Sequence, residues 1–108
     1  MPPLNTFIVE DNTVIYDNLV STLQELTEVK VVGHAVDEPG AVRWLRNDGA
    51  ALDLLIVDIF LRSGSGLGVL KAAQEAHLGA RTVVLTNYAT EDIRKRCAVL
   101  GADRVFDK

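Results

Sequence analysis

The stretch LLIVDIFLRSGSG, residues 54–66, changes from apolar to charged to glycine-rich within thirteen positions. Its first four residues are all aliphatic, which predicts a strand that is buried on both faces, as in a parallel sheet. Asp58 follows directly. An ionised carboxylate is costly to remove from water unless a partner compensates for it. A buried strand that ends in aspartate therefore indicates that this side chain has a partner or a chemical task.

The composition is that of one ordinary globular domain. The chain has 108 residues, of which 48% are hydrophobic and 24% charged, and a net charge of −4, so one core is expected. No apolar run approaches the roughly 20 residues that cross a bilayer, and the N-terminal MPPLN does not resemble a secretory signal. We therefore expect a cytoplasmic chain without membrane contact. The absence of a basic stripe argues against nucleic-acid binding, and the single Cys97 is expected in a buried helix.

Strand-like and helix-like segments alternate along the rest of the chain. Short apolar runs predict strands at residues 6–9, 29–36, 52–57, 82–85 and 104–106. Apolar residues at helical spacing lie between them: Ile15, Leu19, Leu23 and Leu26, then Ala41, Val42 and Leu45, then Leu67, Leu70 and Ala73, then Ile93, Cys97 and Leu100. This alternation predicts an α/β fold, a doubly wound, flavodoxin-like parallel sheet in the order 2-1-3-4-5. Its second and fifth strands would form the edges.

Acidic residues follow the first and third expected strands. Glu10 and Asp11 come directly after the first, and Asp58 after the third. In such a sheet, sites form at the carboxyl ends of the strands where the winding direction reverses, which is between these two strands. Clustered carboxylates repel one another unless a cation compensates for them, and ligands that are all oxygen suit Mg²⁺ better than zinc. The sequence therefore predicts a magnesium site at this edge.

Two further residues extend the same edge. Thr86 follows the fourth strand and Lys108 the fifth. A hydroxyl and an ammonium group that face a carboxylate and a metal ion are suited to a phosphoryl group bonded to Asp58.

In these positions the chain resembles the receiver domain of two-component response regulators. The resemblance rests on Glu10-Asp11 after FIV, Asp58 after LLIV, Thr86 after TVVL and Lys108 after GADRVFD. It covers the whole chain, so residues 1–108 are expected to form one receiver domain.

The resemblance implies a phosphorylation-dependent switch, which is not an enzyme apart from transferring a phosphoryl group to itself. Asp58 would accept that group from a sensor histidine kinase or phosphotransfer protein, and the output would be a downstream protein. Mg²⁺ would be held by the three acidic side chains and the main-chain carbonyl of Phe60. Thr86 and Lys108 would bind phosphoryl oxygens.

Several positions depart from the family pattern. Asn87 stands where a small residue is usual, Arg62 where proline is common, and Val105 where many receivers carry a switching aromatic residue. Phe60 and Tyr88 occupy positions that modulate loss of the phosphoryl group in the family. Two bulky aromatic side chains there would exclude the attacking water, so we expect slow dephosphorylation.

The family's last helix is also missing. Receivers end with a fifth helix packed beside the first, whereas this sequence stops at Lys108. Apolar surface on the fifth strand and the first helix is then expected to be exposed. Either the given sequence is a shortened form of the domain, or a neighbouring chain covers this surface. Since exposed apolar patches favour association, we expect copies of the chain to self-associate.

Other interpretations remain open from the sequence. A phosphatase of the haloacid dehalogenase type usually needs a second aspartate where Phe60 stands, and a flavodoxin-type loop would not carry Glu10-Asp11. A degenerate receiver that serves only as a docking module is a further alternative. Lys108 could be a frayed terminal charge. SGSGLG, residues 63–68, lacks the signature of a phosphate-binding loop and is interpreted as a flexible loop before a helix.

Overall fold

Five parallel strands form one sheet in the order β2-β1-β3-β4-β5 in the computed structural model, which describes residues 2–108. The strands are β1 (Leu4–Val9), β2 (Val29–Ala35), β3 (Leu54–Asp58), β4 (Arg81–Thr86) and β5 (Arg104–Asp107). The helices are α1 (Thr13–Leu26), α2 (Glu38–Asp48), α3 (Gly66–Glu75) and α4 (Glu91–Val99), with a short 3-10 helix, η1 (Gly49–Ala51). The predicted fold class, strand order and edge strands are confirmed.

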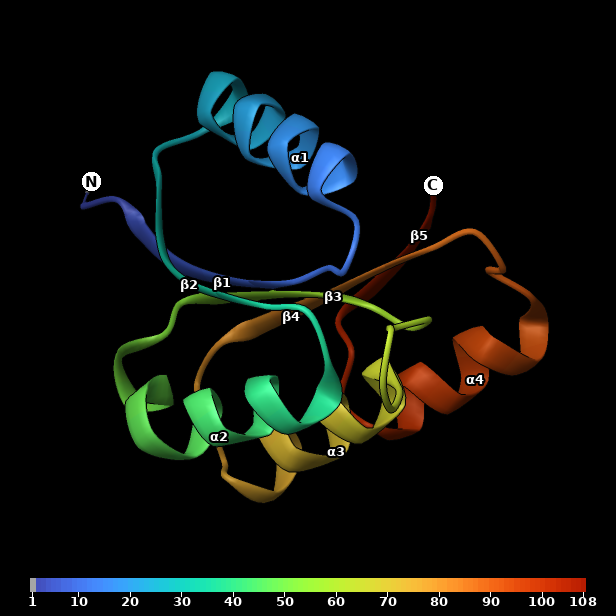
Figure 1. Cartoon of the computed structure of the whole chain (residues 1–108). Helices are drawn as coiled ribbons and strands as arrows, with labels where there is room; N and C mark the ends of the chain where they lie inside the picture. The colour runs from blue at the N-terminus through green and yellow to red at the C-terminus, as the bar shows by residue number, and fades with distance from the viewer. Residues whose placement is uncertain (1) are drawn as a thin grey trace.

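The helices cover the two faces of the sheet unequally (Figure 1). Helix α1 lies alone on one face, and α2, α3 and α4 lie on the other. The main core fills the space beneath these three helices, and its fully buried members include Phe7, Leu55, Val57, Val84 and Cys97. Cys97 is thus buried in a helix, as predicted, and burial raises the pKa of its thiol.

The face that α1 covers is only partly closed. Ile8 and Ile56 are buried there, but none of the residues of α1 is fully buried. Leu26 was expected to extend the apolar stripe of this helix and is instead 77% exposed. It is the last helical residue, where the chain turns away toward β2. Phe106 is 51% exposed, whereas its neighbour Val105 packs on the core, as strand alternation predicts.

Several element boundaries differ from the predicted ones. The third strand was expected from Leu52, but η1 precedes it, and β3 begins at Leu54 and includes Asp58 itself. Similarly, β2 ends at Ala35 rather than at Val36. Among residues 2–108, the helices are too short and too polar to cross a membrane.

A β-bulge fixes how β2 and α2 pack on the sheet. The register of β1 against β2 shifts after Thr6, which pairs with Val31, so that Phe7 pairs with Gly33. The indole of Trp44 from α2 stacks on the Phe7 ring, with centroids 4.1 Å apart and planes 12° apart. A Cβ atom on Gly33 would lie 2.7 Å from the Trp44 Nε1 atom and 2.8 Å from the Phe7 ring. Only glycine therefore permits this stack.

We predict that Gly33→Ala destabilises the fold by about 1–3 kcal/mol, the usual cost of forcing an extra methyl group into a packed core. Gly79→Ala is the matched control, since a Cβ atom there would meet no heavy atom within 4 Å. It should change stability by less than about 1 kcal/mol. Urea unfolding followed by the fluorescence of Trp44, the single tryptophan, measures both. Equal effects of the two substitutions would contradict the packing argument.

Candidate functional site

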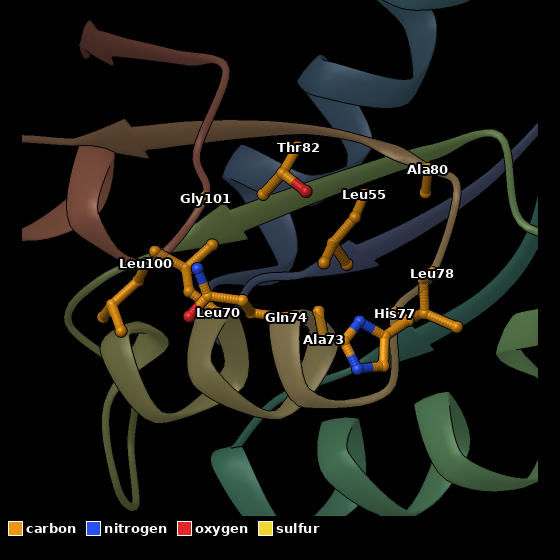
Figure 2. Close-up of a pocket in the computed structure, with 10 residues that line it drawn as sticks. All are labelled: Leu55, Leu70, Ala73, Gln74, His77, Leu78, Ala80, Thr82, Leu100 and Gly101. Atoms are coloured by element: carbon orange, nitrogen blue, oxygen red, sulfur yellow. The ribbon is translucent and has the colours of Figure 1, made fainter.

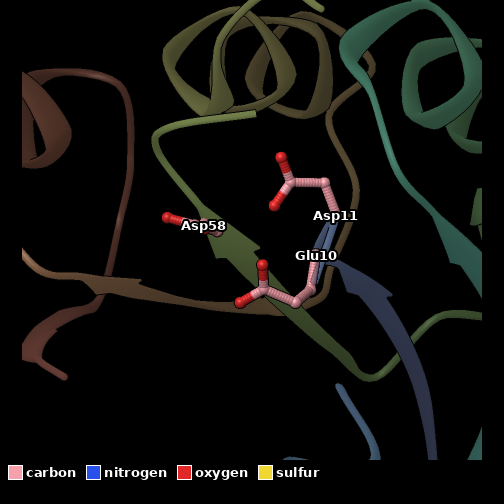
Figure 3. A group of neighbouring side chains, drawn as sticks. All are labelled: Glu10, Asp11 and Asp58. Carbon is pink, nitrogen blue, oxygen red and sulfur yellow. The ribbon is translucent and has the colours of Figure 1, made fainter. Parts of the chain in front are cut away.

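Three carboxylates meet where β1 and β3 end (Figure 3). Val9 pairs with Val57 in the parallel register, so Glu10 and Asp58 are the next residues of adjacent strands. One carboxylate oxygen from each of Glu10, Asp11 and Asp58 lies within 4.8 Å of the others. Glu10 and Asp58 are only 3% and 7% exposed, while Asp11 is partly exposed and meets them from the solvent side. The structure therefore brings together the three acidic residues that the sequence singled out.

Lys108 supplies the positive charge of this cluster. Its Nζ donates to Glu10 Oε1 over 2.7 Å and to Asp58 Oδ2 over 3.0 Å. The Lys108 amide also donates to the carbonyl of Thr86, over 2.9 Å, which continues the β4–β5 pairing to the site. The interpretation of Lys108 as a frayed terminal charge is wrong, because its side chain is 14% exposed and paired with two carboxylates.

The two carboxylates keep Lys108 protonated. Burial by itself lowers the pKa of the ammonium group, but its hydrogen bonds to Glu10 and Asp58, together with the negative charges of these carboxylates, outweigh that effect. The net effect raises the pKa of Lys108 above its ordinary value of 10.5. Lys108 is therefore a permanent cation at neutral pH.

Main-chain amides orient the two buried carboxylates. The Phe60 amide donates to Asp58 Oδ1 over 3.2 Å, and the Asn12 amide donates to Glu10 Oε2 over 3.3 Å. Each carboxylate thus has one oxygen held by an amide and the other by Lys108. Asn12 also caps α1, since its side chain accepts from the Ile15 amide over 3.0 Å. The positive end of the α1 dipole further favours negative charge here.

Thr86 ends β4 beside the cluster but bonds elsewhere. Its buried hydroxyl accepts from the Tyr88 amide over 3.1 Å. The ring of Tyr88 meets that of Phe60 edge to face, with centroids 5.1 Å apart and planes 73° apart. Both rings are more than half exposed. They join the loop after β3 to the loop after β4 at the rim of the site.

One contact of the site was not predicted. Nε2 of His34, on β2, lies 2.9 Å from the Glu10 carbonyl oxygen, and the imidazole ring stacks on Tyr16 with centroids 4.0 Å apart. Because a carbonyl only accepts, this geometry assigns a proton to Nε2. The contact of His34 with Glu10 depends on the shifted register of β2 against β1. No local sequence pattern predicts that shift.

The donor set fits a hard divalent cation. Three carboxylates against one ammonium group leave a negative surplus, and the acidic group contains oxygen ligands without histidine or cysteine. Mg²⁺ and similar ions prefer such ligands, whereas structural zinc prefers nitrogen and sulfur. Phe60 and Ser65 form an antiparallel bridge, in which the Gly66 amide donates to the Ile59 carbonyl. This hydrogen bond does not involve the Phe60 carbonyl.

A cavity of about 370 Å³ lies at the other end of the sheet (Figure 2). It is formed by α3, the turn after α4 and the first residues of β3 and β4, and Leu55, His77 and Thr82 are among its lining residues. The acidic cluster lies at the carboxyl ends of the strands instead. The cavity is therefore separate from the candidate site.

Comparison with known proteins gives consistent matches. The sequence pattern described as "Response regulator receiver domain" matches residues 6–108. The chain is 22% identical over 105 residues to "Response regulator UvrY" of Escherichia coli (strain K12), and equally to that of Shigella flexneri. These alignments cover 97% of this chain and 47% of each relative, so the chain spans about half the length of the curated relatives it matches.

Solved structures share the fold. A CheX-CheY-BeF3-Mg+2 complex from Borrelia burgdorferi matches with a TM-score of 0.90 and 24% identity, covering 98% of this chain and 78% of that chain. The signal receiver domain of the putative response regulator NarL from Mycobacterium tuberculosis matches with a TM-score of 0.86 and 19% identity, covering 97% and 83%. The match to the receiver pattern extends over nearly all of the sequence, and this chain belongs to the family of response regulator receiver domains.

Proposed function

We propose that this chain is a phosphorylation-dependent signalling switch with Asp58 as the phosphoacceptor. The observation that carries the proposal is the arrangement around Asp58, whose two oxygens are held by Lys108 and by the Phe60 amide inside an acidic cluster. The donor would be a phosphohistidine of a sensor kinase or phosphotransfer protein. The output would be a downstream protein.

The chemistry follows from the groups at the site. A carboxylate oxygen of Asp58 attacks the phosphorus atom, the bond to the histidine nitrogen breaks, and its electron pair returns to the imidazole ring. Mg²⁺, held by Glu10, Asp11, Asp58 and the Phe60 carbonyl, would neutralise charge on the transferred group. Lys108 can exchange its present carboxylate contacts for a phosphoryl oxygen, because its ammonium group already lies 3.0 Å from Asp58 Oδ2.

Thr86 offers a route from the site to the surface. Its hydroxyl oxygen accepts from the Tyr88 amide, and the hydroxyl proton would be donated to a phosphoryl oxygen on Asp58, which would draw the side chain and its loop toward the site. The loop after β4 is also tied to β5, since Arg94 donates to the carbonyls of Ala89, over 3.1 Å, and Val105, over 2.9 Å. A shift of this loop would therefore reach the surface of α4 and β5. Phosphorylation would bias two packings of the same elements.

Phosphorylation by a small-molecule donor tests whether Asp58 is the phosphoacceptor. Incubation with acetyl phosphate and Mg²⁺ should add the mass of one phosphoryl group to the intact chain, and Asp58→Ala should abolish the adduct. Asp107→Ala, which removes an exposed carboxylate from the nearby strand β5, should leave it unchanged. Mass spectrometry with and without Mg²⁺ measures this. A parent chain that forms no adduct would sink the proposal and favour a docking-only receiver.

The aromatic rim of the site is expected to set the lifetime of the phosphoryl group. Phe60 and Tyr88 form an aromatic pair at the rim of the site, where they would exclude the attacking water. The double variant Phe60→Asn, Tyr88→Glu should therefore lose phosphate at least about tenfold faster, which is below the roughly 10²–10⁴-fold that a well-positioned acid or base contributes to such a step. Phosphate release after removal of the donor measures the rate. Loss no faster than in the parent would count against an aromatic barrier.

Lys108 is expected to stabilise the fold by neutralising the buried carboxylates. Lys108→Met leaves two buried carboxylates without their shared donor and should lower the free energy of unfolding by about 1–3 kcal/mol. Mg²⁺ should stabilise this variant more than the parent. Because the pKa of Lys108 is raised in the folded protein, the contribution of its ammonium group to stability is fully present below pH 10.5. That contribution is lost only as the pH rises through the raised pKa.

The difference in unfolding free energy between the parent and Lys108→Met should therefore not change near neutral pH through titration of Lys108. Urea unfolding with EDTA and with Mg²⁺ provides the comparison. A variant as stable as the parent in EDTA would show that the ammonium group is dispensable.

A further inference from the structure

The loop that follows Asp58 is held in place from a different part of the chain. Glu38, the first residue of α2, lies against residues 63–68. Its Oε1 atom accepts a hydrogen bond from the Ser65 amide over 2.9 Å. Its own amide donates to the Ser63 carbonyl over 3.0 Å. The two bonds run in opposite directions and fasten the loop to the N-terminus of α2.

Two glycines leave the space that the Glu38 side chain occupies. A Cβ atom on Gly68 would lie 2.3–2.4 Å from the three atoms of the carboxylate. One on Gly64, which has φ of +79°, would lie 2.5 Å from the Glu38 Cβ atom. A Cβ atom at either position would require the Glu38 side chain to move. Gly64 and Gly68 therefore leave room for this carboxylate, and the segment interpreted as a flexible loop has hydrogen bonds to α2.

Two further contacts connect the hydrogen bond between Ser65 and Glu38 to the acidic cluster. Ser65 pairs with Phe60 in an antiparallel bridge, and the flanking Gly66 amide donates to the Ile59 carbonyl over 2.9 Å. The Phe60 amide in turn donates to Asp58 Oδ1. The main chain of Phe60 is thus fixed on one side by Asp58 and on the other by a residue that Glu38 holds.

We propose that Glu38 is a positioning residue for the divalent cation of this site. It acts through Ser65 on the main chain of Phe60 and so holds the Phe60 carbonyl in place for the ion. This inference rests on the proposed function, in which that carbonyl is a ligand. Glu38 is not itself a ligand, because the acidic group at the carboxyl ends of the strands consists of Glu10, Asp11 and Asp58.

The adjacent residue provides a matched control. Asp37 is also acidic, but its side chain caps α2 by accepting from the Gly40 amide over 2.9 Å. Its substitution should lower stability by about 0.5–2 kcal/mol, as for other helix caps, without freeing the loop after Asp58. Comparing the two positions separates loss of stability from loss of positioning.

The experiment is a Mg²⁺ titration of the full chain followed by amide NMR chemical shifts, which requires no phosphorylation. Glu38→Ala should raise the dissociation constant for Mg²⁺ about tenfold, as outer residues of metal sites commonly do, and should shift the Phe60 and Ser65 amide signals. Glu38→Gln keeps an accepting oxygen and should retain affinity close to that of the parent. Asp37→Ala should bind Mg²⁺ as the parent does.

A second variant covers the case in which Glu38→Ala fails to fold. Gly68→Ala leaves Glu38 present but displaces its carboxylate, and it should weaken Mg²⁺ binding in the same way. If the parent binds Mg²⁺ and both Glu38→Ala and Gly68→Ala bind it equally well, this inference is overturned and the proposed function stands. If the parent binds no Mg²⁺, the metal site of the proposed function fails, and the role of Glu38 fails with it.

Discussion

The charge balance at the carboxyl ends of the strands is the constraint on which the site depends. Two like charges about 4 Å apart repel by about 4 kcal/mol near a protein surface, a large share of the roughly 5–15 kcal/mol that stabilises a domain. Glu10, Asp11 and Asp58 come this close because β1 and β3 are adjacent and in register. Lys108 offsets part of the repulsion, and β5 has to pair with β4 for it to arrive there. The last strand is therefore as necessary to the acidic cluster as the two strands that carry it.

Much of this site is encoded in local sequence patterns. Apolar runs mark the strands, and the residues directly after them must share one edge of a parallel sheet, so Glu10, Asp11, Asp58 and Lys108 could be placed together without a structure. Contacts between segments that are distant in the sequence could not be predicted in this way. Nothing near Glu38 indicates that Ser65 is its partner. The exposure of Leu26 was also missed, because an apolar periodicity shows which side of a helix faces the sheet but not how far the sheet extends beneath it.

The two loops that flank Asp58 are held in different ways. The loop after β3 is bonded to α2 through the carboxylate and the main chain of Glu38, and the carboxylate occupies space that a Cβ atom on Gly68 would take. The loop after β4 is held by the hydroxyl of Thr86 and by Arg94, whose side chain is exposed. Because Arg94 is exposed and Glu38 only partly exposed, water can replace the Arg94 bonds more readily than those of Glu38, whereas the Thr86 hydroxyl is buried. In the proposed switch, the β3 side serves as the fixed reference and the β4 side as the part that moves.

The thin cover on the α1 face has a consequence for cooperativity. A helix with no fully buried side chain exposes little new apolar surface when it detaches from the sheet, which favours local unfolding of α1. Its first turn is nevertheless anchored at Asn12, whose amide is bonded to Glu10. A ligand that orders Glu10 therefore also restrains the start of α1. Occupancy of the acidic cluster by the proposed cation would thus be thermodynamically linked to the folding of this helix, although most of the helix lies away from the cluster.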